Sequence, residues 1–274
     1  MCLVAFALGG PQGLAGHQDY RLVLAANRDE FHARETAPAG WWDSEQQVFG
    51  GRDLRAGGSW LAIDRRGRLA AVTNVREPDP LSGPRSRGAL VADFVSGAET
   101  PAAYASRILR HGDEYAGFNL LLIDLRLDEP ALLVSNRDAR QIEPADGQVH
   151  AWSNGTLDAP WPKVVQLQTR LDEALQQPAC ELEPALFAAL ADRTIPDDAL
   201  LPDTGVGRER ERRLAAAMIV APGSGFGTRA STLVAVRRDG NVLFVERSWR
   251  PAGDDLVLSG ERRAGFHLAA SAPA

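Results

Sequence analysis

The chain begins with two apolar runs, and a segment that contains glycine and proline separates them. Residues 2–8 form the first run and residues 20–26 the second. Short apolar runs bounded by turn formers predict the two strands of a β-hairpin with a long loop. Antiparallel counting from the loop places Cys2 opposite about Asn27, where the second strand passes into the polar tetrapeptide 27–30. The sequence therefore predicts a thiol close to the charged residues of this tetrapeptide.

Further along the chain, the same patterns predict groups of strands and groups of helices. Alternation and short continuous apolar runs predict strands, whereas apolar residues at spacings of three and four predict helices. The predicted strands cover residues 59–64, 68–73, 117–125, 131–135, 149–152, 217–220, 228–237 and 242–249, and the predicted helices cover 88–95, 101–110, a segment opened by Pro162, and 183–191. Residues 31–43 and 197–211 are expected to be loops. Strand pairs followed by helices and then by strand pairs indicate the α+β class.

Composition narrows the class of protein. The 274 residues are 45% hydrophobic and 24% charged, which is enough for one large core, so we expect a single domain over residues 1–274. The net charge is -6, and no basic cluster is long enough to follow a phosphate backbone, so nucleic acid is not an expected partner. Cys2 and Cys180 give neither a disulfide framework nor a zinc spacing, which suits the reducing cytoplasm.

Hydropathy bears on membrane association. No apolar stretch reaches the length of a membrane span, and the first run lacks the basic leader of a signal peptide. We therefore expect a cytoplasmic protein with no integral membrane segment. The sequence does not indicate its oligomeric state.

Cys2 has two interpretations. A lone cysteine is commonly a small buried hydrophobic residue, and the tetrapeptide after the second strand is then a polar turn. Cysteine is also small enough for the initiator methionine to be removed, which would leave Cys2 with a free α-amine beside its thiol. Because the reference pKa is about 7.7 to 8 for the amine and about 8.5 for the thiol, the amine can take the thiol proton, and Arg28 would favour the thiolate. Asp29 could hold the ammonium group or orient Arg28, and Asn27 could donate to an oxyanion.

Three further polar residues stand at the ends or beginnings of predicted strands. Asn74 and Asn154 each follow a strand and could offer a side-chain amide to an oxyanion, although asparagine at such a place is commonly a turn former. Arg229 follows a glycine-rich loop and could orient the thiolate, or it could be a surface arginine paired with an acid. The five histidines show no metal-ligand spacing, so no metal site is expected.

Several motifs, in this order, resemble one family. They are Cys2, the run LAANRDEF at 24–31, GGSWL at 57–61, LAAVTN at 69–74 and GTRAST at 227–232. The family is the NRDE family, also called the transport and Golgi organisation protein 2 family, and the resemblance extends to about Trp249. It implies the four-layer αββα sandwich of the N-terminal nucleophile hydrolases and a chemistry similar to that of cysteine amidases such as bile-salt hydrolase and penicillin V acylase. Members have also been linked to haem movement and to secretory-pathway organisation, so the resemblance indicates the fold better than the reaction.

The resemblance also implies a set of site residues. The expected catalytic residues are Cys2, Arg28, Asp29, Asn74, Asn154 and Arg229, and the expected substrate-binding residues are Asn27, Glu30, His32 and Trp60. Bile-salt hydrolases place Arg-Asn before the aspartate, whereas here the asparagine precedes the arginine. The expected function is hydrolysis of a small amide or acyl compound by Cys2 after removal of Met1, without a cofactor. The alternative is a non-catalytic carrier of haem or another small molecule, with Cys2 or a histidine, His32 first, as the haem ligand. The sequence leaves open whether the protein is an enzyme.

Overall fold

The structure is a computed structural model of the chain, and it describes residues 2–9, 14, 19–43, 47–78, 83–126 and 129–269. Contacts divide the chain into two compact units. The first unit comprises Met1–Ala33, Arg76–Pro78 and Ala145–Gly265, and the second comprises Arg34–Val75, Asp79–Pro144 and Phe266–Ala274. Each unit has its own sheet, helices and core. The expectation of a single domain stays a prediction.

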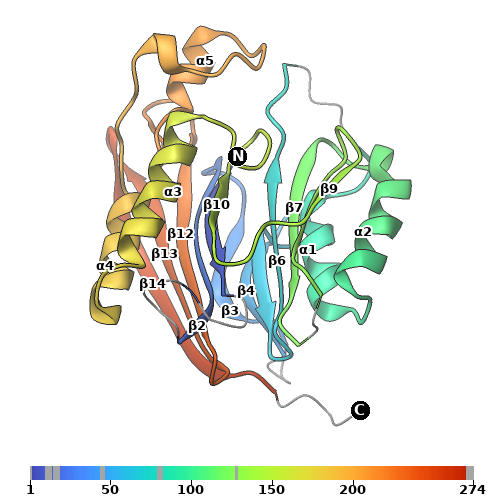
Figure 1. Cartoon of the computed structure of the whole chain (residues 1–274). Coiled ribbons are helices and arrows are strands. Elements are labelled where there is room, and N and C mark those ends of the chain that lie inside the picture. Colours follow the sequence, from blue (N-terminus) through green and yellow to red (C-terminus); the bar gives the residue numbers. More distant parts are fainter. Residues whose placement is uncertain are drawn as a thin grey trace. The chain divides into compact units, whose positions relative to one another are not determined.

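The first unit contains an antiparallel sheet with the strand order β10-β1-β2-β12-β13-β14, and the short β11 pairs with β12. Its strands are β1 (Cys2–Leu8), β2 (Tyr20–Phe31), β10 (Val149–Trp152), β11 (Val220–Ala221), β12 (Phe226–Arg237), β13 (Asn241–Ala252) and β14 (Asp255–His267). Its helices are α3 (Pro162–Ala174), α4 (Ala179–Leu190) and α5 (Arg208–Arg213), with a 3-10 turn at Asp198–Leu200. Figure 1 shows α3 and α4 lying along this sheet.

The core of the first unit lies between its sheet and the helices α3 and α4. Alternate residues of a strand point to opposite faces, so every second residue of β1 and β2 can pack against the helices. These residues are Leu3, Ala5, Ala7, Val23 and Ala25, and they meet Val164, Leu167 and Leu171 of α3 and Leu182, Leu186 and Leu190 of α4. By the same alternation, Asn27 and Asp29 belong to the helix-facing side of β2. The hydrophobic pattern thus carries two polar residues of the tetrapeptide into the interior.

The second unit contains an antiparallel sheet in the order β3-β4-β5-β6-β7-β8-β9. The strands are β3 (Thr36–Trp41), β4 (Val48–Asp53), β5 (Leu61–Asp64), β6 (Arg68–Asn74), β7 (Phe118–Asp124), β8 (Leu132–Ser135) and β9 (Arg140–Ile142). The helices are α1 (Arg87–Ser96) and α2 (Pro101–Arg110), followed by a 3-10 turn at Gly112–Glu114. Helix α1 packs on β4 to β7, and α2 packs on β7 and β8. Leu90, Val91, Phe94, Tyr104 and Ile108 supply the helical side of this core.

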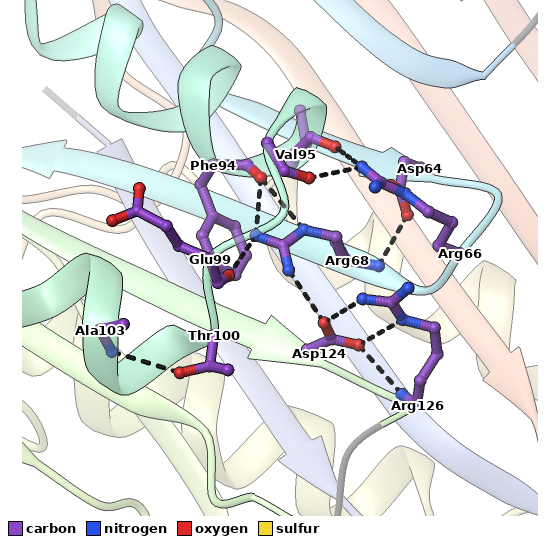
Figure 2. A network of polar contacts seen from close by, with 11 residues as sticks. Asp64, Arg66, Arg68, Phe94, Val95, Glu99, Thr100, Ala103, Asp124 and Arg126 are labelled. Carbon is purple, nitrogen blue, oxygen red and sulfur yellow. Dashed lines mark hydrogen bonds and ion pairs between the residues drawn. The ribbon is translucent and has the colours of Figure 1, made fainter. Parts of the chain in front are cut away.

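A buried arginine connects the sheet of the second unit to its helices through hydrogen bonds. Arg68 at the start of β6 is 0% exposed and forms an ion pair with Asp124 at 3.0 Å. Its Nε and Nη2 atoms donate to the main-chain oxygens of Phe94 and Glu99, which lie at the end of α1 and just before α2 (Figure 2). Because a buried charge is costly unless it is paired and hydrogen-bonded, these partners explain how the sheet accommodates Arg68.

The motif GGSWL has a structural use in the second unit. At Gly58, an added Cβ would lie 2.2 Å from the main-chain carbon of Gly88, so only glycine lets this segment approach the first turn of α1. The next residue uses this closeness, because the Ser59 N–H donates to the Gly88 oxygen at 3.1 Å. Trp60 is buried against Gly51, where an added Cβ would lie 2.2 Å from the indole ring.

Most predicted elements are present, and the differences have physical causes. The predicted hairpin is observed with Cys2 opposite Arg28, one residue from the expected register. The segment 31–43, expected to be a loop, contains β3, and the segment 197–211 leads into α5, whose Glu211 is buried. Strand β14 carries charged residues on a largely exposed edge, so it lacks the apolar alternation by which strands are recognised.

The α+β class is confirmed. Each unit supplies one sheet layer and one helix layer, which are the layers of the predicted αββα sandwich. Within the described residues, no helix combines the length and the hydrophobicity that crossing a membrane would require.

Candidate active site around Cys2

Two neighbouring strands hold Cys2. It is the first residue of β1 and is 9% exposed. On one side it pairs with Arg28 of β2. On the other side β1 pairs with β10, and just beyond the end of β10 the Ser153 hydroxyl donates to the Cys2 main-chain oxygen at 2.7 Å. The backbone of Cys2 is therefore fixed by residues that lie far apart in the sequence.

The surroundings of Cys2 favour the protonated form of its thiol. Burial raises the pKa of the thiol above its ordinary value, and the negative charge of Asp29 raises it further. The charge of the terminal ammonium group acts most strongly in the opposite direction, and the charge of Arg28 and a hydrogen bond from the Asp29 main-chain N–H add to it. We expected Arg28 to favour the thiolate, and its charge does so, but burial outweighs it. The thiol therefore needs a base to take its proton before it can attack.

Asp29 is a buried carboxylate beside Cys2. Its Oδ1 accepts a hydrogen bond from the Thr228 hydroxyl at 2.7 Å, and Thr228 is its partner across β2 and β12. Burial raises the pKa of Asp29. The positive charge of Lys163 is the strongest influence that lowers it, followed by the charge of the terminal ammonium group, the Thr228 hydrogen bond and the charge of Arg76. Burial outweighs these groups, so the pKa of Asp29 lies above its ordinary value.

Lys163 was not predicted as a site residue. It lies in the first turn of α3, is 3% exposed, and donates from Nζ to the Leu214 oxygen at 2.9 Å. Burial lowers the pKa of Lys163 to about 8, and the charge of Arg76 acts in the same direction, whereas the charges of Asp29, Cys2 and Glu211 oppose this change. The sequence does contain a signal for it, because Lys163 is the only lysine among 30 basic residues.

A buried ion pair stands next to Asn154. The side-chain oxygen of Asn154 lies 3.1 Å from the Ser153 hydroxyl oxygen and 3.4 Å from Nη2 of Arg76. Arg76 is paired with Glu211 of α5, and its guanidinium lies 4.7 Å from the Trp161 ring centroid. No local sequence pattern indicates this arrangement, because its partners come from four separate segments of the chain.

Both the nitrogen and the oxygen of the Asn27 side-chain amide form hydrogen bonds within the protein. Its amide nitrogen donates to the oxygens of Leu190 and Ala217, both at 2.8 Å, and its oxygen accepts from Ser231 at 2.6 Å. The visible role of Asn27 is therefore to join β2 to α4, to β12 and to the segment 214–219. Its expected place in substrate binding stays a prediction.

The remaining candidates of the first unit lie at the end of β2. Oε1 of Glu30 accepts from the Phe31 N–H at 2.8 Å. Arg229 occupies a bulge of β12 and donates to the Phe31 oxygen at 2.9 Å and to the His32 oxygen at 3.2 Å. Burial and the charge of Arg229 lower the pKa of His32, so its imidazole is neutral near pH 7. These contacts position the strand end.

Two candidates belong to the second unit. Asn74 is the last residue of β6, where it pairs with Phe118, and Trp60 packs beside β4. The structure thus brings Cys2, Arg28, Asp29 and Asn154 together within the first unit and places Asn74 and Trp60 in the other. The catalytic and binding roles of all ten residues stay predictions. Among the described residues, no three His, Cys, Asp or Glu side chains are grouped as metal ligands.

Comparison with known sequences gives a consistent family. The family model described as Transport and Golgi organisation 2 matches residues 1–251. The Transport and Golgi organization protein 2 homolog of Bos taurus is 35% identical over 260 residues, which cover 90% of this chain and 93% of that protein. The homolog of Homo sapiens is 32% identical over 260 residues with the same coverage. These matches confirm the resemblance drawn from the motifs.

Comparison with solved structures finds weaker likenesses. An N-acylethanolamine-hydrolyzing acid amidase ortholog of Caenorhabditis elegans has a TM-score of 0.44 and 9% identity, covering 84% of this chain and 91% of that one. The C2A mutant of conjugated bile acid hydrolase from Clostridium perfringens has a TM-score of 0.43 and 8% identity, covering 96% of both chains. Likenesses at this level carry no conclusion about activity.

Proposed function

The chain belongs to the Transport and Golgi organisation 2 family, and we propose that this member is a cysteine amidohydrolase that cleaves a small amide or related acyl compound with Cys2 as its nucleophile. The observation that carries the proposal is the setting of Cys2, a buried thiol that receives the Asp29 N–H and lies beside the buried charges of Arg28 and Asp29. An ordinary core cysteine has apolar neighbours and needs no charged ones. We also propose the cytoplasm as its compartment, because both cysteines are free.

The first step requires a base for the thiol. Once Met1 is removed, the nearest base is the α-amine of Cys2, because it belongs to the same residue as the thiol. Asp29 holds this amine in place. The thiol gives its proton to this amine, and the sulfur attacks the carbonyl carbon of the substrate. The proton then passes to the departing nitrogen, so an amine leaves and an acyl thioester remains on Cys2.

The second step releases the acyl group. The free α-amine takes a proton from water, the hydroxide attacks the thioester carbon, and the proton returns to the sulfur as the carboxylic acid departs. In both steps the carbonyl oxygen gains negative charge. Pre-placed donors at this oxygen lower the barrier by about 3 kcal/mol each in other acyl-transfer enzymes, and we assign this task to the Asn154 amide group.

The test uses the Cys180→Ser protein, so that Cys2 is the only thiol. Intact mass first shows whether Met1 has been removed. The protein is then mixed with p-nitrophenyl acetate and quenched in acid, and a set of N-acyl p-nitroanilides with increasing acyl length tests amide cleavage. We expect a transient acetyl adduct on Cys2 and release of p-nitroaniline, both absent after Cys2→Ala. A folded protein that retains Met1, or that acquires no adduct at Cys2, would refute the proposal.

Haem titration separates the proposal from the carrier alternative. If the protein binds haem, and Cys2→Ala changes neither haem binding nor the acetylation of the protein by p-nitrophenyl acetate, the carrier function replaces the proposed hydrolase function. If Cys2→Ala weakens haem binding, the thiol is a haem ligand.

A further inference from the structure

Arg76 contacts Asn154 through both its main chain and its side chain. The Arg76 main-chain N–H donates to the Asn154 main-chain oxygen at 2.8 Å, and Nη2 of Arg76 lies 3.4 Å from Oδ1 of Asn154. Both residues are buried, with exposed fractions of 7% and 1%. The residue to which we assign the stabilisation of the oxyanion is therefore in direct contact with a guanidinium group.

This contact determines which end of the Asn154 amide faces Arg76. A guanidinium group carries only donors, so the oxygen of a neighbouring amide turns towards it and the nitrogen turns away. Oγ of Ser153 lies 3.1 Å from the same oxygen, but its one hydrogen is donated to the Cys2 main-chain oxygen. Of these two neighbours, only Arg76 can donate to the amide oxygen. The nitrogen is the end that can donate to an oxyanion, and it lies on the opposite side of the planar amide group.

Other residues hold the guanidinium group of Arg76 in place. Nη1 donates to Glu211 of α5, and the Trp161 ring centroid lies 4.7 Å from the guanidinium carbon. Glu211 in turn accepts from the Thr204 main-chain N–H at 3.0 Å and from the Thr204 hydroxyl. Because a guanidinium group is a rigid planar fork, fixing Nη1 also fixes the direction of Nη2.

We propose that Arg76 is a positioning residue of the Cys2 site: it sets the amide orientation of Asn154 so that the nitrogen, and not the oxygen, is presented to the carbonyl oxygen of the substrate. The inference rests on the proposed function, because it concerns the donor assigned there. Arg76 does not touch the substrate. It acts through Asn154, since an inverted amide would place its oxygen against the developing negative charge and raise the barrier.

The alternative is a purely structural role, in which the ion pair between Arg76 and Glu211 only holds α5 against residues 76–78. A buried ion pair with this role can often be replaced by apolar residues of similar volume without loss of stability, whereas removal of one partner is costly. An apolar pair could thus keep α5 in place, but it could not donate to the Asn154 oxygen. The two roles therefore predict different results when both charges are removed together.

The test replaces both partners in one protein, Arg76→Met/Glu211→Met, and measures the acylation of Cys2 by p-nitrophenyl acetate. All proteins carry Cys180→Ser. We expect the Tm of this protein to stay close to the wild-type value. Acylation should nevertheless slow by about 10-fold or more, as it does when a catalytic group is misplaced. Arg213→Met, which removes an exposed guanidinium group from α5, is the matched control and should react at the wild-type rate. A wild-type rate in the folded Arg76→Met/Glu211→Met protein would overturn the proposal.

A second comparison asks whether the effect depends on Asn154. Asn154→Leu removes the amide group and should slow acylation by about 100-fold or more, as the loss of one oxyanion donor does. Adding Arg76→Met/Glu211→Met to this protein should change the rate by less than about 2-fold, because no amide is left to be positioned. A further loss equal to that seen with Asn154 present would contradict the proposal.

A third comparison uses Tm alone and does not depend on acylation. Asn154→Asp places a carboxylate beside Arg76, which can bind it by a charge-assisted hydrogen bond. Adding Arg76→Met/Glu211→Met should therefore lower the Tm more in the Asn154→Asp protein than in the Asn154→Leu protein. Equal changes would show that Arg76 does not bind the side chain at this position, and the proposal would fall. If wild-type Cys2 is not acylated at all, the proposed function fails, and this comparison still decides whether the contact exists.

Discussion

The hydroxyl of Ser153 donates a 2.7 Å hydrogen bond to the main-chain oxygen of Cys2, although the two residues are 151 positions apart. This bond ties the end of β10 to the residue that carries the candidate nucleophile. It also satisfies a buried carbonyl group that would otherwise be costly.

Replacement of Ser153 by alanine should therefore destabilise the protein and loosen Cys2. We expect a loss of about 1 to 3 kcal/mol in the free energy of unfolding, which is the usual cost of a buried acceptor without a partner. Urea denaturation measures this loss, and the rate of Cys2 acylation measures the loosening. Ser259→Ala is the matched control, because its hydroxyl makes an equivalent bond to the Ser248 oxygen at an exposed position. Equal stability of the two variants would contradict the importance of the bond.

The ion pair between Arg76 and Glu211 should make a large difference when one partner is removed. Both side chains are buried, so Arg76→Met or Glu211→Gln leaves the other group poorly compensated, and we expect a loss of about 3 to 5 kcal/mol. Denaturation in urea tests this, with Arg213→Met as the control. Arg213 pairs with Glu209 on the exposed side of α5, so its loss should cost under about 1 kcal/mol. A small effect at Arg76 would mean that the pair is not buried in solution.

Arg68 should matter in the same way for the second unit. Arg68→Met removes the ion pair with Asp124 and three bonds to the main-chain oxygens of Phe94 and Glu99. We expect about 3 to 5 kcal/mol of destabilisation and faster hydrogen exchange in α1 and α2. Arg107→Met, which removes an exposed pair with Glu99, is the control and should leave exchange in both helices unchanged.

The buried thiol should also give the protein a characteristic pH dependence. Burial raises the pKa of Cys2 in the folded state, so above about pH 8.5 the unfolded chain loses this proton first. Stability contributed by this group is thus unaffected below about pH 8.5 and falls as the pH rises above it, by up to about 1.4 kcal/mol per pH unit. Cys2→Ala removes the effect. The unfolding free energy of the wild type minus that of the variant should decrease between about pH 7 and about pH 9.5, and a constant difference would contradict a raised pKa.

The sequence predicted those parts of the site that depend on local pattern. Two apolar runs around a turn determine a hairpin, and the register came within one residue because antiparallel counting from the loop relates each residue of one strand to a residue of the other. The alternation of side chains along a strand indicates that the Asn27 side chain faces the helices. Both the nitrogen and the oxygen of its amide group form hydrogen bonds there.

The partners of the site could not be predicted in this way. Arg76, Lys163 and Glu211 meet only because three distant segments fold together, and no periodicity near any one of them indicates the other two. Arg76 stands in a polar stretch that resembles solvated surface, yet it is buried. Only the unusual use of lysine was visible, and it indicates a special position without naming its partners.

The strand order of the first unit also governs how the protein reaches its native state. Strand β2 lies between β1, its neighbour along the chain, and β12, whose Ser231 meets Asn27 across 204 residues. Hairpins between adjacent strands form in about 1 to 10 μs, whereas contacts between distant residues must first overcome the entropy of closing a long loop. The hairpins β1-β2 and β12-β13 should therefore form early and join late. Thr228 reaches Asp29 only at this late docking step, so the charged surroundings of Cys2 should be among the last features to be completed during folding.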